Sequence, residues 1–128
     1  SFRSVIKMLS NDEGGFAFLR SDNAAIIWRE EHYDHPIPIA DKFKALMTTK
    51  GTGWGTRLIF TNIKDIFNAS KDGFFLKTMD GEGFFIPTSD TNYFKDIGIT
   101  IGGNINGIKN VYTNGLKQIN HVLIVEVK

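Results

Sequence analysis

His32, Asp34 and His35 are the one group of neighbours whose side chains suit a metal ion, because imidazole and carboxylate groups are zinc ligands. On a strand His32 and Asp34 share a face and His35 does not. On a helix the two histidines converge, but Pro36 disfavours a helix there. Zinc needs about three or four ligands, and His121, the remaining histidine, is distant in sequence. A polar loop leading into Pro36 is the favoured interpretation, and no metal ion is expected.

The residues that could support catalysis do not form a recognisable set. Glu30 and Glu31 are adjacent, so on a strand their carboxylates point to opposite faces and cannot act as an acid–base pair. The chain has no cysteine, and no serine lies in a Gly-x-Ser-x-Gly motif. We therefore predict a protein that is not an enzyme and that uses no cofactor.

The glycine-rich segment 51–56 resembles a phosphate-binding loop only superficially. It lacks the Gly-Lys-Ser/Thr ending of a P-loop, and Thr56 occupies the place of the third glycine of a dinucleotide fingerprint. Two interpretations of Trp54 stay open. Its indole either lies at a loop tip, where it suits a sugar ring or a protein partner, or packs back on the core.

Aromatic residues thus provide the main candidates for ligand binding. Trp54, Tyr33 and Tyr93 are predicted stacking platforms for a sugar, with Trp28 as a further platform. Arg57 completes the candidate ligand-binding set, although a solvated strand face is the alternative account of this residue.

Length and charge narrow the class of protein. A chain of 128 residues fits one domain, since domains usually contain about 100–200 residues. Its 15 basic and 14 acidic residues give a formal net charge of +1, without the basic block typical of nucleic-acid binders. No apolar run approaches the roughly 20 residues that span a bilayer. We expect one domain over 1–128, with neither nucleic acid nor membrane insertion.

The elements that hold these candidate residues in place are predicted to be short strands. Eleven Phe, 13 Gly and 3 Pro are typical of aromatic strands separated by turns. Asn and Asp suit the bends because they tolerate left-handed backbone, and Asp-Gly between apolar runs indicates a hairpin. The predicted strands are 15–20, 24–29, 73–78, 84–86 and 122–128, with turns at 21–23 and 80–83.

Helical evidence is confined to one segment. Residues 39–47 fit two helical turns, with Phe43, Leu46 and Met47 on one face. The stretch 48–55 is predicted to be a long exposed loop because of its glycines. The fold class is therefore all-β with at most one short helix, built of short antiparallel strands and hairpins. It is either β-sandwich-like or an intertwined trimeric fibre domain.

An apolar-Lys-Asp/Asn-apolar phrase occurs at 63–66, 94–97 and 108–111. The spacing between copies is irregular, which excludes a strict solenoid period. Either the copies reflect a related strand–turn unit, or they are coincident β-turn tetrapeptides.

Two segments, 18–29 and 98–111, resemble bacteriophage tail-fibre sequence in their short strands and Asn-Gly corners. The resemblance implies a location on the virion, at the extracellular surface, and a homotrimer in which inward apolar side chains meet their symmetry mates. It also implies attachment to a bacterial receptor, either polysaccharide or outer-membrane protein. Because the chain starts at Ser1 and finishes in a strong strand signal, we expect a C-terminal fragment of a longer fibre protein.

Two other functions remain as alternatives. One is a monomeric carbohydrate-binding β-sandwich that uses exposed aromatics. The other is a fibre-associated polysaccharide depolymerase, which would need paired carboxylates in a groove. Candidate pairs are Asp80 with Glu82 and Asp90 with Asp96.

Overall fold

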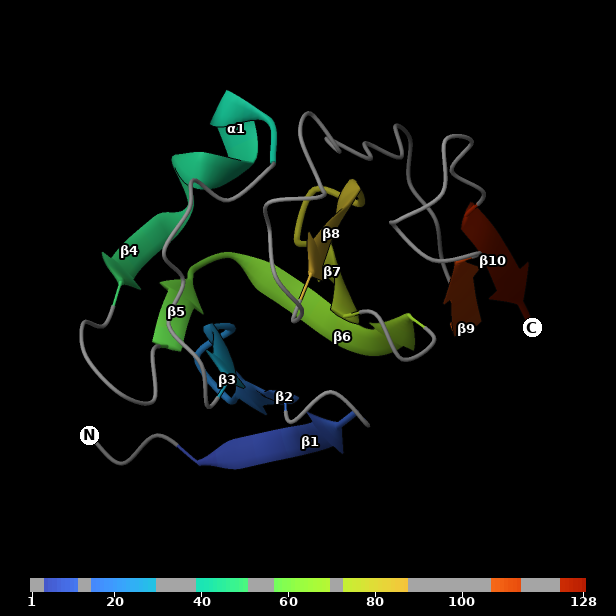
Figure 1. The fold of residues 1–128 in the computed structure, drawn as a ribbon, viewed down its shortest axis with the longest axis horizontal. Coiled ribbons are helices and arrows are strands. Elements are labelled where there is room, and N and C mark those ends of the chain that lie inside the picture. The colour runs from blue at the N-terminus through green and yellow to red at the C-terminus, as the bar shows by residue number, and fades with distance from the viewer. Residues whose placement is uncertain are drawn as a thin grey trace.

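The computed structural model describes residues 4–11, 15–29, 39–50, 57–69, 73–87, 107–113 and 123–128. These ranges contain ten strands and one short helix, which confirms the prediction of an all-β fold with at most one short helix (Figure 1). Within the same ranges, no helix has the length and apolar character needed to cross a membrane.

The first sheet, sheet A, has five strands in the order β1-β2-β3-β5-β4, and every neighbouring pair is antiparallel. Strand β1 therefore forms one edge, at the bottom of Figure 1. The strands are β1 (Val5–Ser10), β2 (Gly15–Arg20), β3 (Ala25–Arg29), β4 (Met47–Lys50) and β5 (Arg57–Phe60). Two of them, β2 and β3, are the first predicted hairpin.

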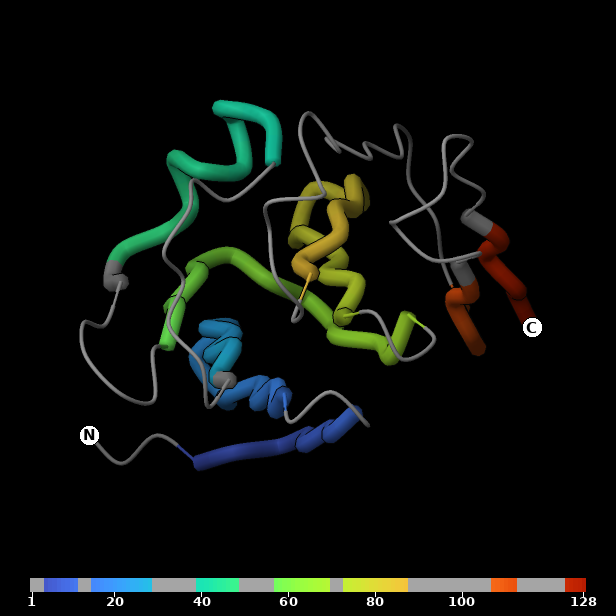
Figure 2. The backbone as a smooth tube through the Cα atoms, in the orientation of Figure 1, coloured from blue at the N-terminus to red at the C-terminus, as the bar shows by residue number. Residues whose placement is uncertain are grey.

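The second sheet, sheet B, has five strands in the order β10-β9-β6-β7-β8. The strands are β6 (Ile63–Ala69), β7 (Gly73–Thr78), β8 (Gly83–Pro87), β9 (Ile108–Thr113) and β10 (Leu123–Val127). The contact between β6 and β9 is parallel, at Ala69 opposite Val111, so this sheet is mixed, and its other neighbouring pairs are antiparallel as predicted. The chain passes from sheet A to sheet B directly, because β5 leads into β6 (Figure 2).

Side-chain alternation explains how the sheets pack. In β2, Ala17 and Leu19 are buried whereas Phe16 and Phe18 are only half-buried, as expected when one face of a strand meets the core. In β7 and β8 every position is buried, so both faces of these strands are covered.

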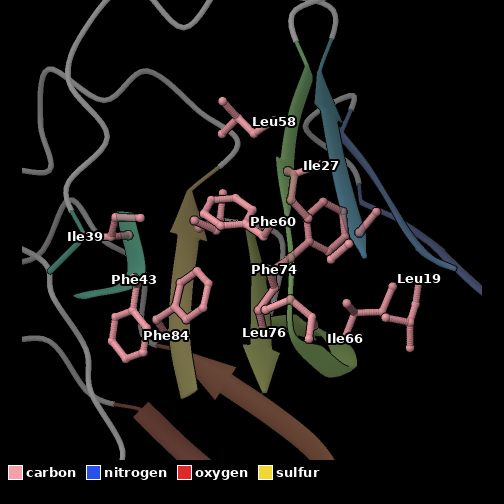
Figure 3. Close-up of a cluster of buried hydrophobic side chains, with 14 residues drawn as sticks. Leu19, Ile27, Ile39, Phe43, Leu58, Phe60, Ile66, Phe74, Leu76 and Phe84 are labelled. Carbon is pink, nitrogen blue, oxygen red and sulfur yellow. The ribbon is translucent and has the colours of Figure 1, made fainter. Parts of the chain in front are cut away.

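The main core lies between the inner faces of the two sheets (Figure 3). Phe84 of β8 is central to it: its ring stacks on Phe43 at 4.4 Å between centroids and lies 5.4 Å from Phe60 of β5. A second apolar cluster includes Phe75 and Phe85, which alternate with the core-facing residues of β7 and β8. Sheet B therefore contributes buried side chains from both faces.

The helix predicted over 39–47 is much shorter than expected. Helix α1 spans Asp41–Lys44 and buries Phe43, but Ala40 provides no side-chain cap. Met47 begins β4 and lies opposite Phe60, so the predicted loop over 48–55 is wrong at its first three residues. The reason is non-local: from Met47 onward the backbone pairs with β5 and does not continue the helix.

The repeated phrases at 63–66 and 108–111 lie in strands β6 and β9, so interpreting them as turn tetrapeptides is wrong for these two copies. The two strands are parallel neighbours in sheet B. The copy at 94–97 lies outside the described residues, as does the glycine-rich part of the predicted loop, 51–55.

The predicted turn at 21–23 depends on Asn23, whose φ is +63°. Its side-chain Nδ2 donates to the carbonyl of Ile63 at 3.1 Å, and its own carbonyl accepts from the Ile63 N–H at 2.9 Å. The turn is thus tied to the start of β6.

Replacing Asn23 with alanine is expected to lower the free energy of unfolding by about 1–2 kcal/mol, since it adds left-handed strain and removes one hydrogen bond. Urea denaturation measures this. The control is Asn62→Gly, at φ +57° with an exposed side chain, where no loss is expected. An Asn23→Ala protein as stable as the parent would show that the turn does not need this residue.

Candidate functional site

Most of the predicted site residues lie outside the described residues: Trp54, Tyr33, Tyr93, the histidine-rich segment 32–35 and His121. Arg57 is described; it is the first residue of β5 and its side chain is exposed. In the ranges that the structure describes, no group of three or more His, Asp or Glu residues could hold a metal ion.

Of the carboxylate pairs considered for catalysis, the structure describes Asp80 with Glu82. Glu82 forms an ion pair with Lys42, so it links the β7–β8 turn to α1, while Asp80 is exposed in that turn. Asp90, Asp96 and the adjacent pair Glu30–Glu31 lie outside the described residues.

The structure brings together a set of residues on the face of sheet A that turns away from the main core, which we call the outer face. Antiparallel registry arranges them in two rows across four strands. The first row, the apolar row, contains Met8, Phe18, Ile26 and Ile59. The second, the outer row, contains Ser10, Phe16, Trp28 and Arg57.

The aromatic residues of the outer face pack against one another. The ring of Phe16 lies 5.5 Å from that of Trp28 with an interplanar angle of 46°, and 6.4 Å from that of Phe18 at 13°. All three side chains are half-buried, so part of each remains accessible to solvent. Mutual packing fixes their positions, which lowers the entropy cost of stacking a ligand against them.

Among the described residues, Arg57 is the charged member of the outer row, and its side chain is exposed. Arg20 lies beyond the apolar row, where its guanidinium donates to both carboxylate oxygens of Asp22, at 3.0 and 2.9 Å. None of the ion pairs formed within the described ranges includes Arg57, which lies directly opposite Trp28. The outer row therefore ends in an exposed guanidinium beside an indole.

A second exposed apolar surface is the edge strand β1, which we call the exposed edge. Val5, Ile6 and Met8 are 52%, 61% and 66% exposed. The one charged residue of this strand, Lys7, turns inward, where its Nζ lies 2.8 Å from Asp65 Oδ1 and 4.5 Å from the ring centroid of Phe67. The ammonium group of Lys7 is thus paired with sheet B and does not point outward from the edge.

Strand β10, an edge strand of sheet B, carries an exposed charge as well as exposed apolar side chains. Tyr112 and Ile124 form an exposed pair on β9 and β10. Glu126 of β10 remains on the surface, where it accepts from Asn110 at 3.1 Å and lies 3.5 Å from Lys109 Nζ. An exposed charge on an edge strand disfavours pairing with another chain. Of these two edges, β1 is therefore the less protected.

Sequence reasoning missed Phe16, Phe18 and the whole of β1. The signal for the two phenylalanines was the alternation of bulky aromatics with Ala17 and Leu19 in the first hairpin. The signal for β1 was weaker because a register shift between Val5 and Lys7 interrupts the alternation of its apolar residues.

Two surfaces thus stand out: the outer row, which combines aromatic faces with a cation, and the exposed edge, which combines apolar side chains with unpaired backbone. The first suits a planar or anionic ligand, and the second suits another strand. No protein-family model, no curated protein and no solved structure matches this chain.

Proposed function

We propose that this chain is a non-enzymatic structural and receptor-binding domain of a bacteriophage tail fibre, acting as a homotrimer on the virion at the bacterial surface. The observation that carries the proposal is the exposed edge, where β1 presents Val5, Ile6 and Met8 to solvent. An apolar edge without an outward charge is a template for pairing with another chain.

Pairing through β1 is favoured energetically as well as geometrically. The three side chains are each more than half exposed, and a strand added beside β1 would cover part of each, which contributes roughly 25 cal/mol per Å² of apolar surface covered. A strand from a second copy would also satisfy the free backbone groups on the outer side of β1. When the contact joins different patches on neighbouring copies, a threefold rotation between copies closes a trimer, whereas a rotation that does not close gives an open filament.

The sequence resemblance adds independent support. The fibre-like segment 18–29 coincides with the β2–β3 hairpin, and the described end of the second segment lies in β9. Short strands joined by tight corners are what the resemblance implies, and β2 is the strand that pairs with β1.

Light scattering at micromolar concentration is expected to give three times the monomer mass. The double substitution Ile6→Lys and Met8→Lys should shift the protein to monomer, because it introduces positive charge into the exposed edge of each copy. The control is Met79→Lys, which adds one positive charge at an exposed methionine of the β7–β8 turn and should leave the trimer intact.

A parent protein that stays monomeric at these concentrations would contradict the assembly. The second candidate is then the monomeric carbohydrate-binding module, favoured by the packed aromatics Phe16, Phe18 and Trp28 on the outer face. A glycan-dependent change in tryptophan fluorescence on the monomer would support that candidate.

A further inference from the structure

The outer row combines two kinds of contact within a span of three adjacent strands. Phe16, Trp28 and Arg57 are direct cross-strand neighbours on β2, β3 and β5. With strands about 4.8 Å apart, the row is about 10 Å long from its first to its last backbone. One small ligand can therefore contact the aromatic rings and the guanidinium together.

The rings of Phe16 and Trp28 determine which part of a ligand can pack on the outer row. Phe16 and Trp28 are half-buried and packed against each other at 5.5 Å, so their accessible parts form one apolar platform held by the sheet. Such a platform suits the C–H face of a sugar ring, and the indole N–H of Trp28 can donate to a sugar hydroxyl when it is accessible.

The guanidinium of Arg57 determines which charged group the ligand should carry. Arg57 is exposed, no ion pair within the described ranges includes it, and the carboxylate of Asp22 is engaged by Arg20. A guanidinium binds a carboxylate with two parallel hydrogen bonds, which gives both energy and orientation. The complementary ligand is a sugar that carries a carboxylate.

Two other occupants fit less well. A nucleic acid needs several cations along its backbone, whereas the outer row has one and the whole chain has a net charge of +1. A second copy packed face to face would press Arg57 against an outer row that contains no carboxylate to pair with it, which is costly.

From this geometry we infer that the outer row of Phe16, Trp28 and Arg57 binds the acidic sugar residues of a bacterial polysaccharide. The inference rests on the receptor-binding role proposed above and names the chemical class of the receptor. It is compatible with assembly through β1, because strand pairing at an edge extends sheet A and leaves its outer face open.

The test uses tryptophan fluorescence on the full chain. The chain has two tryptophans, so Trp54→Phe leaves Trp28 as the reporter on the outer row. Polygalacturonate is expected to quench or shift the emission of this protein in a saturable way, whereas dextran, a neutral polysaccharide, should not. The apparent affinity should fall as salt is raised, because the Arg57 contact is exposed.

Substitutions separate the contributions of charge and ring. Arg57→Gln should weaken polygalacturonate binding about tenfold or more, and Arg57→Lys should weaken it less, since the charge remains but the paired donors do not. Lys64→Gln is the matched control, because it removes an exposed cation from β6 of sheet B and should leave the affinity unchanged. Calorimetry on Trp28→Ala, with far-UV circular dichroism to check folding, should show a comparable loss.

The outcomes distinguish this inference from the proposed function. A trimer by light scattering that gives no response to polygalacturonate would overturn the acidic-sugar inference and leave the assembly in place. A monomer that responds, and loses the response in Arg57→Gln, would support the inference and contradict the trimer. An equal response to dextran, or to oligo(dT), would overturn it, since either one shows that the row does not select a sugar carboxylate.

Discussion

Truncating Phe84 to alanine is expected to lower the free energy of unfolding by about 3–5 kcal/mol, the largest effect that we predict for a single side chain. Phe84 is fully buried in β8 and contacts α1 through Phe43 and sheet A through Phe60. Its removal therefore loosens the contact between three elements at once and leaves a cavity in the main core.

The matched control is Phe18→Ala, which makes the same chemical change on the half-buried outer face of sheet A. Because Phe18 retains solvent access and borders no closed core, its removal should cost less than half as much. Equilibrium unfolding in urea or guanidinium, followed by tryptophan fluorescence and circular dichroism, measures both values. Equal losses would show that Phe84 is not the centre of the core.

The second large effect is expected at Gly73, the first residue of β7. A Cβ at this position would lie 2.1 Å from the carbonyl oxygen of Ile86, 2.8 Å from Phe85 Cζ and 2.9 Å from the Cα of Pro87. Two of these atoms belong to the backbone of β8, so the strand pair must separate to admit a methyl group. Gly73→Ala is expected to cost about 3 kcal/mol, at the upper end for overpacking.

Gly107 provides the control for this substitution. Its φ is +69°, but a Cβ there would meet only Lys128 Cβ, at 3.9 Å. Gly107→Ala should therefore cost about 1 kcal/mol, the price of left-handed backbone alone. Thermal unfolding of the two variants separates steric conflict from backbone strain. A Gly73→Ala protein as stable as Gly107→Ala would contradict the close approach of β7 and β8.

Local sequence was sufficient to predict the hairpins and turns. The runs at 15–20 and 24–29 flank Ser21-Asp22-Asn23, and the structure places strands β2 and β3 around that turn. The Asp-Gly of the second hairpin behaves in the same way, with Gly81 at φ +86° between β7 and β8. These features depend on backbone preferences and on periodicity over a few residues, and both can be read from the local sequence.

The shortness of α1 was not predictable in the same way. Phe43, Leu46 and Met47 have helical spacing, but only Asp41–Lys44 is helical. The chain instead uses Met47 to begin β4, where pairing with β5 provides the hydrogen bonds. Whether such a segment continues as a helix depends on a strand that is ten residues away, and local propensity contains no information about that strand.

The candidate site, too, was predictable from the sequence only in part. Sequence reasoning included Arg57 and considered Trp28, both of which lie on the outer row, but gave no reason to connect them. They are neighbours because β3 pairs with β5 in a particular register, and a shift of one residue would turn one of them to the opposite face. The remaining candidates, Trp54, Tyr33 and Tyr93, lie outside the described residues.

By itself, then, the amino-acid sequence determined that this protein is built of short aromatic strands and where its tight turns fall, because those properties arise within a few neighbouring residues. Only the tertiary structure decided the strand order, the parallel contact of β6 with β9, and the inward turn of Lys7 that leaves β1 apolar. It also decided that Phe16, Trp28 and Arg57 share a face. Each of these depends on which distant strands pair and in which register, and that is settled by burial of the whole chain.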